Sequence, residues 1–192
     1  MKNQTVFKRY EIKYLITKQQ KNTITDIMCE YMYGDEYGKN TLCNVYFDTD
    51  DYLLIRRSIE KPIYKEKLRI RSYGLASPES KVFVEMKKKY KSVVYKRRIA
   101  MKEAAAMHYV CNKIQSQKNT QITQELNYFL SLYEDLAPKV FLSYEREAFY
   151  AKDDVNFRIT FDENILWRDY DLSLCSGIYG TSILPDEKVL ME

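Results

Sequence analysis

Residues 64–73, with the sequence YKEKLRIRSY, decide the fold that we predict for this chain. The apolar residues Leu68 and Ile70 alternate there with Lys67, Arg69 and Arg71. Successive side chains of a β-strand point to opposite faces of its sheet, so one face of this segment is apolar and the other is basic. We therefore predict a strand that separates two very different environments.

The same alternation continues in the next two segments, 81–89 and 92–101. Gly and Pro within 74–80 and the short connection at 90–91 predict tight turns, so these strands should form an antiparallel meander. Further strands are predicted at 5–16, 42–47, 139–150, 155–161, 165–167 and from 188 onward, and helices at 18–32, 52–59, 102–117 and 121–134. Asp48-Thr49-Asp50 is predicted to cap the second helix. This order of strands, helices and strands predicts the α+β class.

The chain has 192 residues, 45% of them hydrophobic, which is enough for one core, and we expect a single domain over 1–192. No apolar run approaches the roughly 18 residues needed to cross a membrane. The N-terminus leads into a polar strand pattern rather than a signal peptide. We therefore expect a cytoplasmic protein without a membrane segment.

The sequence argues against cysteine-based sites, histidine-based sites and glycine-rich phosphate loops. Cys29, Cys43, Cys111 and Cys175 are far apart without a CxxC pair, so we predict buried, reduced thiols rather than a zinc site or disulfides. His108 is the single histidine, which argues against histidine triads and His-rich metal sites. Because no glycine-rich phosphate loop is present either, any phosphate must be bound by side chains.

Five predicted strands carry Lys and Arg on the same phase, with carboxylates among them. For one strand, a solvated sheet face is the simpler explanation. Five such strands favour an anion ligand, because guanidinium groups bind phosphate at several points. If this face turned inward, the charges would repel one another unless a polyanion neutralised them, while the carboxylates could hold a divalent cation that bridges phosphates. The members are Arg9, Glu11 and Lys13; Lys67, Arg69 and Arg71; Glu85, Lys87 and Lys89; Lys96 and Arg98; Arg158 and Asp162.

Seven short motifs occur in order along the chain: FKRYEIKY (7–14), YFDT (46–49), KLRIRSY (67–73), VEMK (84–87), VYKRR (94–98), SYEREAF (143–149) and FRITFD (157–162). Together they resemble the VTC domain, the catalytic module of polyphosphate polymerases, within the triphosphate tunnel metalloenzyme (CYTH-like) superfamily. The resemblance runs from about Phe7 to Glu192. It implies an antiparallel, eight-stranded β-tunnel (barrel) with a basic lumen and helices packed outside.

The resemblance also implies roles for individual residues. Phosphates would be bound by the first strand and by the KxRxR strand, and a metal by the glutamate of the last strand, which falls on Glu192. The implied catalytic residues are Lys13, Arg69, Arg71, Lys96 and Arg146. The implied phosphate-binding residues are Lys67, Lys87, Arg98, Arg158 and Arg9. The implied ligands of Mn²⁺ or Mg²⁺ are Glu192, Glu11 and Glu85.

This sequence departs from the family pattern in two places. Arg146 is out of phase with Glu145 and Glu147, and Leu142, Tyr144 and Ala148 look core-facing, so its inward position rests on the motif unless a bulge reconciles the two. Glu192 is the last residue, so the family's following lysine and closing helix have no counterpart here. We therefore expect either that the natural chain continues beyond Glu192 or that the tunnel is less completely built at this end.

The function implied by the resemblance is a metal-dependent polyphosphate polymerase that extends inorganic polyphosphate with the terminal phosphate of ATP. Two alternatives stay open: a tunnel-fold triphosphatase, and a non-catalytic module that binds polyphosphate or triphosphate. RNA binding is weaker, because an RNP-type aromatic signature is absent. The expected partners are thus ATP or another triphosphate and inorganic polyphosphate, with no nucleic acid.

Overall fold

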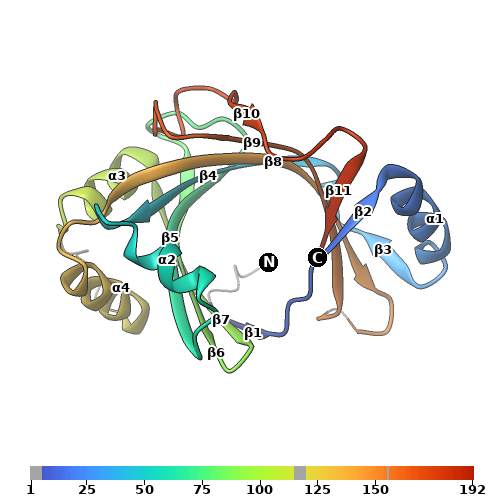
Figure 1. The fold of residues 1–192 in the computed structure, drawn as a ribbon, viewed down its shortest axis with the longest axis horizontal. Coiled ribbons are helices and arrows are strands. Elements are labelled where there is room, and N and C mark those ends of the chain that lie inside the picture. Colours follow the sequence, from blue (N-terminus) through green and yellow to red (C-terminus); the bar gives the residue numbers. More distant parts are fainter. Residues whose placement is uncertain (1–5, 115–119, 155) are drawn as a thin grey trace.

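The computed structural model describes residues 6–114, 120–154 and 156–192, with the side chains of 6–9 outside the description. Its strands form one antiparallel sheet that curves into a ring, with helices outside it (Figure 1). The strands are β1 (Val6–Arg9), β2 (Tyr14–Thr17), β3 (Met32–Gly34), β4 (Asn40–Asp48), β5 (Tyr64–Tyr73), β6 (Lys81–Tyr90), β7 (Val93–Lys102), β8 (Ala137–Ala151), β9 (Arg158–Arg168), β10 (Thr181–Ser182) and β11 (Lys188–Met191). The helices are α1 (Lys18–Met28), α2 (Leu53–Ile59), α3 (Glu103–Cys111) and α4 (Gln121–Leu132).

The order of strands around the ring is β1-β7-β6-β5-β4-β8-β9-β11-β2. The two edge strands, β1 and β2, follow each other directly in the N-terminal segment. The sheet therefore curls far enough for its two edges to lie next to each other. Counting this segment as one wall, β4 to β9 and β11 complete the predicted eight-stranded tunnel, and the α+β class is confirmed. The short strands β3 and β10 are additions that pair with β8 and β9.

The N-terminal strand was predicted to run unbroken over 5–16, and the structure interrupts it. Pairing of β1 with β7 ends at Arg9 and Val94, and pairing of β2 with β11 begins at Tyr14 and Met191. Residues 10–13 lie between these two ladders and belong to neither strand. Hydrogen bonding therefore leaves the ring open at this point. The sheet is not closed, as we expected, but the opening lies in the N-terminal segment and not at Glu192.

The main hydrophobic core lies on the outer face of the sheet. Leu68 and Ile70 of β5 and Val84 and Met86 of β6 are fully buried there, in one cluster with apolar residues of α2, α3 and α4. Figure 1 shows α3 and α4 outside the ring on one side and α1 on the other. Because the apolar phase faces outward under helices, the polar phase of the same strands must face inward. We call this concave surface the inner face.

Helix α1 covers the opposite part of the outer face. Phe161 and Val189 are buried beneath it in a second core. Thr17 caps the helix, accepting a hydrogen bond from the backbone of Gln20, whose side chain accepts one in return from the backbone of Thr17. The helix ends at Met28 rather than at the predicted Met32, because residues 32–34 pair with β8 as β3.

The predicted cap of α2 is confirmed, with Asp48 in the leading role. Both carboxylate oxygens of Asp48 accept hydrogen bonds from backbone N–H groups, those of Leu54 at 2.8 Å and Ile55 at 2.9 Å. These are donors in the first turn that the helix cannot satisfy by itself. The cap therefore connects the end of β4 to α2.

Several local predictions are corrected. Cys29 and Cys111 are exposed, so the expectation of buried thiols is wrong for them; both lie at helix ends that turn toward solvent, whereas Cys43 is buried in the sheet. Helix α3 ends at Cys111, and the predicted end near residue 117 lies outside the described residues. The separate strand predicted at 165–167 is the continuation of β9, which pairs with β8 along most of its length.

Among the helices described, none is long and apolar enough to cross a membrane.

The packing of α4 on the sheet gives a direct stability test. Leu126 is fully buried, whereas Leu132 at the end of the same helix is 53% exposed. We expect Leu126→Ala to lower the free energy of unfolding by about 2–5 kcal/mol, because it leaves a cavity in the core. Urea denaturation followed by circular dichroism measures the change, and Leu132→Ala should cost less than about 1 kcal/mol. Equal effects of the two substitutions would contradict this packing.

Candidate functional site

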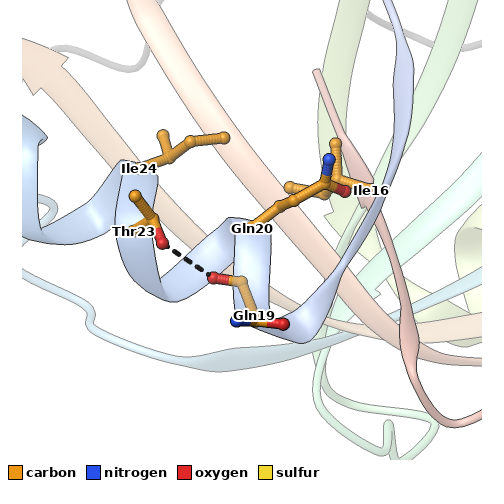
Figure 2. A pocket seen from close by; sticks show the side chains of 5 residues that line it. All are labelled: Ile16, Gln19, Gln20, Thr23 and Ile24. Atoms are coloured by element: carbon orange, nitrogen blue, oxygen red, sulfur yellow. Dashed lines mark hydrogen bonds between the residues drawn. The ribbon is translucent and has the colours of Figure 1, made fainter.

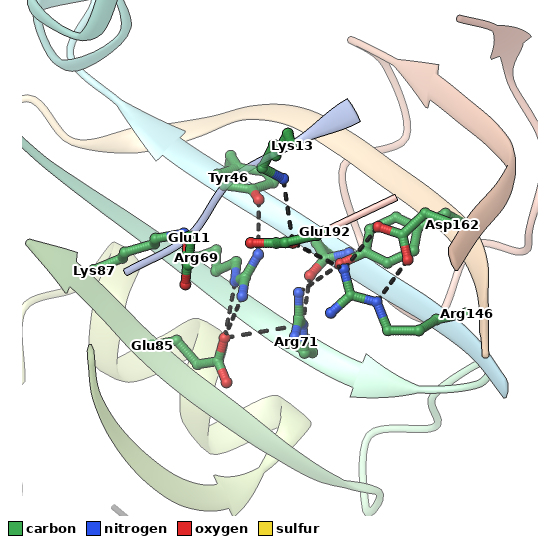
Figure 3. Close-up of polar contacts among 12 residues, drawn as sticks. Glu11, Lys13, Tyr46, Arg69, Arg71, Glu85, Lys87, Arg146, Asp162 and Glu192 are labelled. Carbon is green, nitrogen blue, oxygen red and sulfur yellow. Dashed lines mark hydrogen bonds and ion pairs between the residues drawn. The ribbon is translucent and has the colours of Figure 1, made fainter. Parts of the chain in front are cut away.

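Cross-strand register brings polar side chains together on the inner face. One row across the sheet joins Tyr46, Arg69, Glu85 and Arg98 from four consecutive strands. The next row joins Lys67, Lys87 and Lys96. Residues directly opposite each other have side chains close enough to interact. The cations that the sequence places on separate strands are thus assembled on one surface (Figure 3).

Glu85 is at the centre of the first group, which we call the Glu85 cluster: Glu85, Arg69, Arg71 and Lys96. Its Oε2 accepts from Nε of Arg69 at 2.8 Å and lies 2.7 Å from Nη2 of the same guanidinium. Nζ of Lys96 lies 2.5 Å from Oε1, and Nε of Arg71 lies 3.9 Å from Oε2. Burial alone would raise the pKa of Glu85, but the three cations hold it well below its ordinary value. Glu85 is therefore a permanent counter-ion, and the structure does not test its predicted role as a metal ligand.

Strand β4 supplies acceptors for both arginines, which sequence reasoning missed. The hydroxyl of Tyr46 accepts from Nη1 of Arg69 at 2.8 Å, and Oδ1 of Asn44 accepts from Nε of Arg71 at 2.8 Å. From β8, the hydroxyl of Tyr144 accepts from Nη2 of Arg71 at 2.6 Å. These contacts fix each guanidinium and still leave N–H groups for a further acceptor. The signal that identifies Asn44 and Tyr46 is the register of β4 with β5, which pairs them with Arg71 and Arg69 and is known only from the structure.

Tyr46 also has an electrostatic signature. Burial would raise the pKa of its hydroxyl, but the charges of Arg69 and Arg71, the hydrogen bond from Arg69 and the charge of Lys67 together lower it. A neutral phenol whose pKa falls in this way reports a strongly positive potential. An anionic ligand would experience the same potential.

Two lysines of the inner face are held in unfavourable surroundings. Burial lowers the pKa of Lys96 to about 7, with the charges of Arg69 and Arg71 acting in the same direction against Glu85. Burial also lowers the pKa of Lys67, as do the charges of Lys65, Lys87 and Lys13. The charged form of both lysines is destabilised in the folded protein, and a bound anion would stabilise it.

A second group, the Glu192 cluster, consists of Arg146, Asp162, Glu192 and Lys13. Nε and Nη2 of Arg146 donate to the two oxygens of Asp162 at 2.6 and 2.7 Å, and Nη2 lies 3.5 Å from Oε2 of Glu192. Nζ of Lys13 lies 3.3 Å from the same oxygen of Glu192. Burial would raise the pKa of Glu192, but Lys13, Lys87 and Arg146 lower it to about 2. Glu192 is thus a carboxylate at neutral pH.

The structure resolves the phase problem at Arg146. Arg146 and Tyr144 share the inner face, and Glu145 and Glu147 face outward, where they pair with Lys39 and Lys21. Tyr144 is a buried core residue, as predicted, in a small cluster with Leu42 and Ile165. This cluster lies on the inner face, where the hydroxyl of Tyr144 accepts a hydrogen bond from Arg71. Tyr144 and Arg146 are two residues apart on β8 and share a face. The register is irregular between Ser143 and Glu145, in the pairing of β8 with β9.

The other predicted residues lie around these two clusters. Lys87 forms an ion pair with Glu11 across the opening at residues 10–13. Arg98 stacks on Phe83, with its guanidinium carbon 4.8 Å from the ring centre. Arg158 is exposed at the start of β9 and pairs in register with Tyr150, away from both clusters. Arg9 ends β1, but its side chain lies outside the described part of the structure.

Carboxylates suited to a divalent cation occur in the Glu192 cluster. Asp162 and Glu192 meet at the same guanidinium nitrogen, and both carry carboxyl oxygens, the kind of donor that Mn²⁺ and Mg²⁺ prefer. Within the described ranges, no group of three or more His, Cys, Asp or Glu residues is arranged as a metal site. Such an ion would therefore need phosphate oxygens to complete its coordination, which is common for Mg²⁺.

A groove of about 380 Å³ lies elsewhere, beside the first turns of α1 and the end of β2 (Figure 2). Its lining is Ile16, Gln19, Gln20, Thr23 and Ile24, which includes no charged side chain. Gln20 is already occupied with the cap of α1. The groove therefore offers no chemistry comparable to that of the inner face.

Removing the hydroxyl of Tyr46 tests its contact with Arg69. We expect Tyr46→Phe to weaken binding of inorganic triphosphate about 3- to 10-fold, because Arg69 loses the acceptor that orients it. Isothermal calorimetry measures the affinity. Tyr64→Phe is the matched control, since it removes a 2.6 Å hydrogen bond to Glu66 on the outer face. If the two variants bind triphosphate equally well, Tyr46 does not position Arg69.

Lys67 gives a prediction in which stability and binding change in opposite directions. Because the folded state lowers the pKa of Lys67, its charge is disfavoured there, and Lys67→Met should raise the unfolding free energy of the ligand-free protein at neutral pH. Triphosphate affinity should fall at least about 10-fold with the loss of a charged donor. Thermal unfolding and calorimetry measure the two effects, with Lys88→Met on the outer face of β6 as the control. A destabilised variant with unchanged affinity would refute this interpretation.

Comparison with known proteins supports the fold and identifies the family. The sequence matches the VTC domain family over residues 8–192. A candidate adenylate cyclase from Bacillus halodurans has the same fold, with a TM-score of 0.56 and 16% identity over 96% of this chain and 80% of that one. A candidate adenylyl cyclase from Hippeastrum, described as having a dominant triphosphatase activity, is more distant, with a TM-score of 0.48 and 12% identity over 97% and 76% of the two chains.

No curated protein matches the sequence. The likeness to the Bacillus halodurans structure concerns the fold alone, because so few residues are identical. The family match is of a different kind, since it spans nearly the whole chain and includes the strands that carry the Glu85 and Glu192 clusters. The chain belongs to the VTC domain family.

Proposed function

We propose that this protein is a metal-dependent polyphosphate polymerase, which transfers the terminal phosphoryl group of ATP to inorganic polyphosphate. One observation carries the proposal: the polar phase of the strands converges on the inner face, where cations outnumber carboxylates. Such an excess is costly unless a polyanion is bound. The cations are Lys13, Lys67, Arg69, Arg71, Lys87, Lys96, Arg98 and Arg146, and the carboxylates are Glu11, Glu85, Asp162 and Glu192.

Arg69 and Arg71 are the best-prepared phosphate ligands of this surface. Each is held by acceptors on a neighbouring strand, so little side-chain freedom is lost when a phosphate binds. Lys67 and Lys96 lie beside them and become more readily protonated as negative charge arrives. We propose that these four side chains hold the triphosphate.

The transfer step needs no nucleophile from the protein. A terminal oxygen of the polyphosphate attacks the γ-phosphorus of ATP, the bond from that phosphorus to the bridging oxygen breaks, and ADP leaves while the chain grows by one phosphate. Negative charge spreads over the transferring oxygens in the transition state. Donors already fixed in place stabilise that charge without reorganising, which is the role we assign to Arg69, Arg71 and Arg146.

Asp162 and Glu192 would hold the divalent cation, with Glu11 nearby on the N-terminal segment. When bound, such an ion neutralises phosphate charge and bridges phosphate oxygens. Arg146 contacts both carboxylates, so it is ideally situated to exchange these contacts for phosphate oxygens. Lys13 stays paired with Glu192 at the margin of the group.

A triphosphatase is the second candidate, and one observation favours it. Residues 10–13 leave an interruption in the hydrogen-bonded wall beside Lys87 and Glu11. Solvent that enters there could replace polyphosphate as the acceptor, and the same cations would stabilise the transition state. The two activities differ only in the attacking oxygen, so the products distinguish them.

The test is incubation of the purified protein with ATP and Mn²⁺, followed by measurement of acid-insoluble polyphosphate and free phosphate. We expect polymer to form, and to disappear when EDTA removes the metal. Arg69→Ala should lower the rate about 10²- to 10³-fold, as does the loss of one preorganised donor elsewhere.

Arg97→Ala is the matched control for Arg69→Ala. Arg97 lies on the outer face of β7, with its Nε 3.4 Å from Glu125 of α4, so its loss should leave the rate within about twofold. Free phosphate without polymer would replace the polymerase with the triphosphatase. If the protein binds triphosphate tightly but forms neither polymer nor free phosphate, it is a binding module. An unchanged rate for Arg69→Ala would refute both proposed enzymatic activities.

A further inference from the structure

The inner face changes character beyond Arg71. Two residues further along β5 is Tyr73, which shares the inner phase of Arg69 and Arg71 and is 54% exposed. Phe83 lies opposite Arg71 in register, and its ring meets that of Tyr73 edge-on, with centroids 5.9 Å apart. The row of cations is therefore followed by a pair of aromatic rings.

Apolar and cationic neighbours complete this end. Leu42 pairs with Tyr73 in register and is buried, which makes an apolar floor beside the exposed ring. Arg98 and Lys81 lie over Phe83, at 4.8 and 5.6 Å from its centre. Ala100 is opposite Phe83 on β7 and is exposed, so a short side chain leaves space above the rings. Phe83 is thus covered, whereas Tyr73 presents a free face.

We propose that Tyr73, supported by Phe83 and Leu42, is the platform on which the base of a nucleoside triphosphate stacks while its phosphates lie along Arg71, Arg69 and Lys67. This inference rests on the proposed function, because it assumes that the cations bind a triphosphate. It adds a base site at one end of the inner face and therefore a direction for the bound nucleotide.

The arrangement matches the chemistry of the ligand. A nucleoside triphosphate is polyanionic at one end and carries a flat aromatic base at the other. This surface is complementary, with cations at Lys67, Arg69 and Arg71 and an aromatic ring at Tyr73. Tyr73 and Arg71 are two residues apart on one strand, which separates them by ~7 Å and leaves room for the sugar between phosphate and base. Aromatic side chains stack on all bases, since every base has a π-face.

The experiment compares ATP with inorganic tripolyphosphate, which has the same phosphates but no base. Isothermal calorimetry in metal-free buffer measures both affinities, so that turnover does not interfere. We expect Tyr73→Ala to weaken ATP binding about 10-fold or more and to leave tripolyphosphate binding within about twofold. Tyr73→Phe should restore ATP binding, because it keeps the ring. Tyr90→Ala is the control, since Tyr90 is a similarly exposed ring at the far end of β6.

The outcomes separate this inference from the proposed function. If Tyr73→Ala leaves ATP binding unchanged, or weakens both ligands equally, the base platform is refuted while triphosphate binding stands. The same holds if Tyr73→Phe fails to restore ATP binding. If the unaltered protein binds neither ligand, the proposed function and the base platform fall together.

Discussion

The carboxylate of Glu85 is the interaction on which the inner face depends. Arg69 and Arg71 of β5 and Lys96 of β7 converge on it, and without it their charges would face one another in a partly desolvated space. Asp162 has the same role for Arg146. Each carboxylate neutralises only part of the positive charge around it. The repulsion is reduced enough for the protein to fold without a ligand, and the remaining positive charge can still bind an anion.

This arrangement is possible because the hydrophobic core is elsewhere. Leu68, Ile70 and Val84 are buried on the outer face, beneath helices, so the sheet is stabilised from outside. Over much of its area the concave side therefore does not pack against other elements, and it can carry charged groups two residues apart along β5, β6 and β7. An exception is the cluster around Leu42 and Tyr144, where apolar contact continues on the inner face.

Much of this could be predicted from sequence. The alternation at 64–73 correctly separated core from inner face, since the phase of a strand is a local property of the backbone. It correctly indicated that Tyr144 is core, but it did not show that this part of the core shares the inner face with Arg146. It was also uninformative for Asn44 and Tyr46, whose importance lies in facing Arg71 and Arg69 across the sheet.

The sequence by itself determined the composition of each face, the cap of α2 and the motifs that name the family. Only the tertiary structure decided that the basic face is concave, that Asp162 rather than Glu145 serves Arg146, and that the ring opens at residues 10–13. The reason is physical: phase follows from neighbouring residues, whereas curvature and ion pairing depend on the register between strands far apart in the chain.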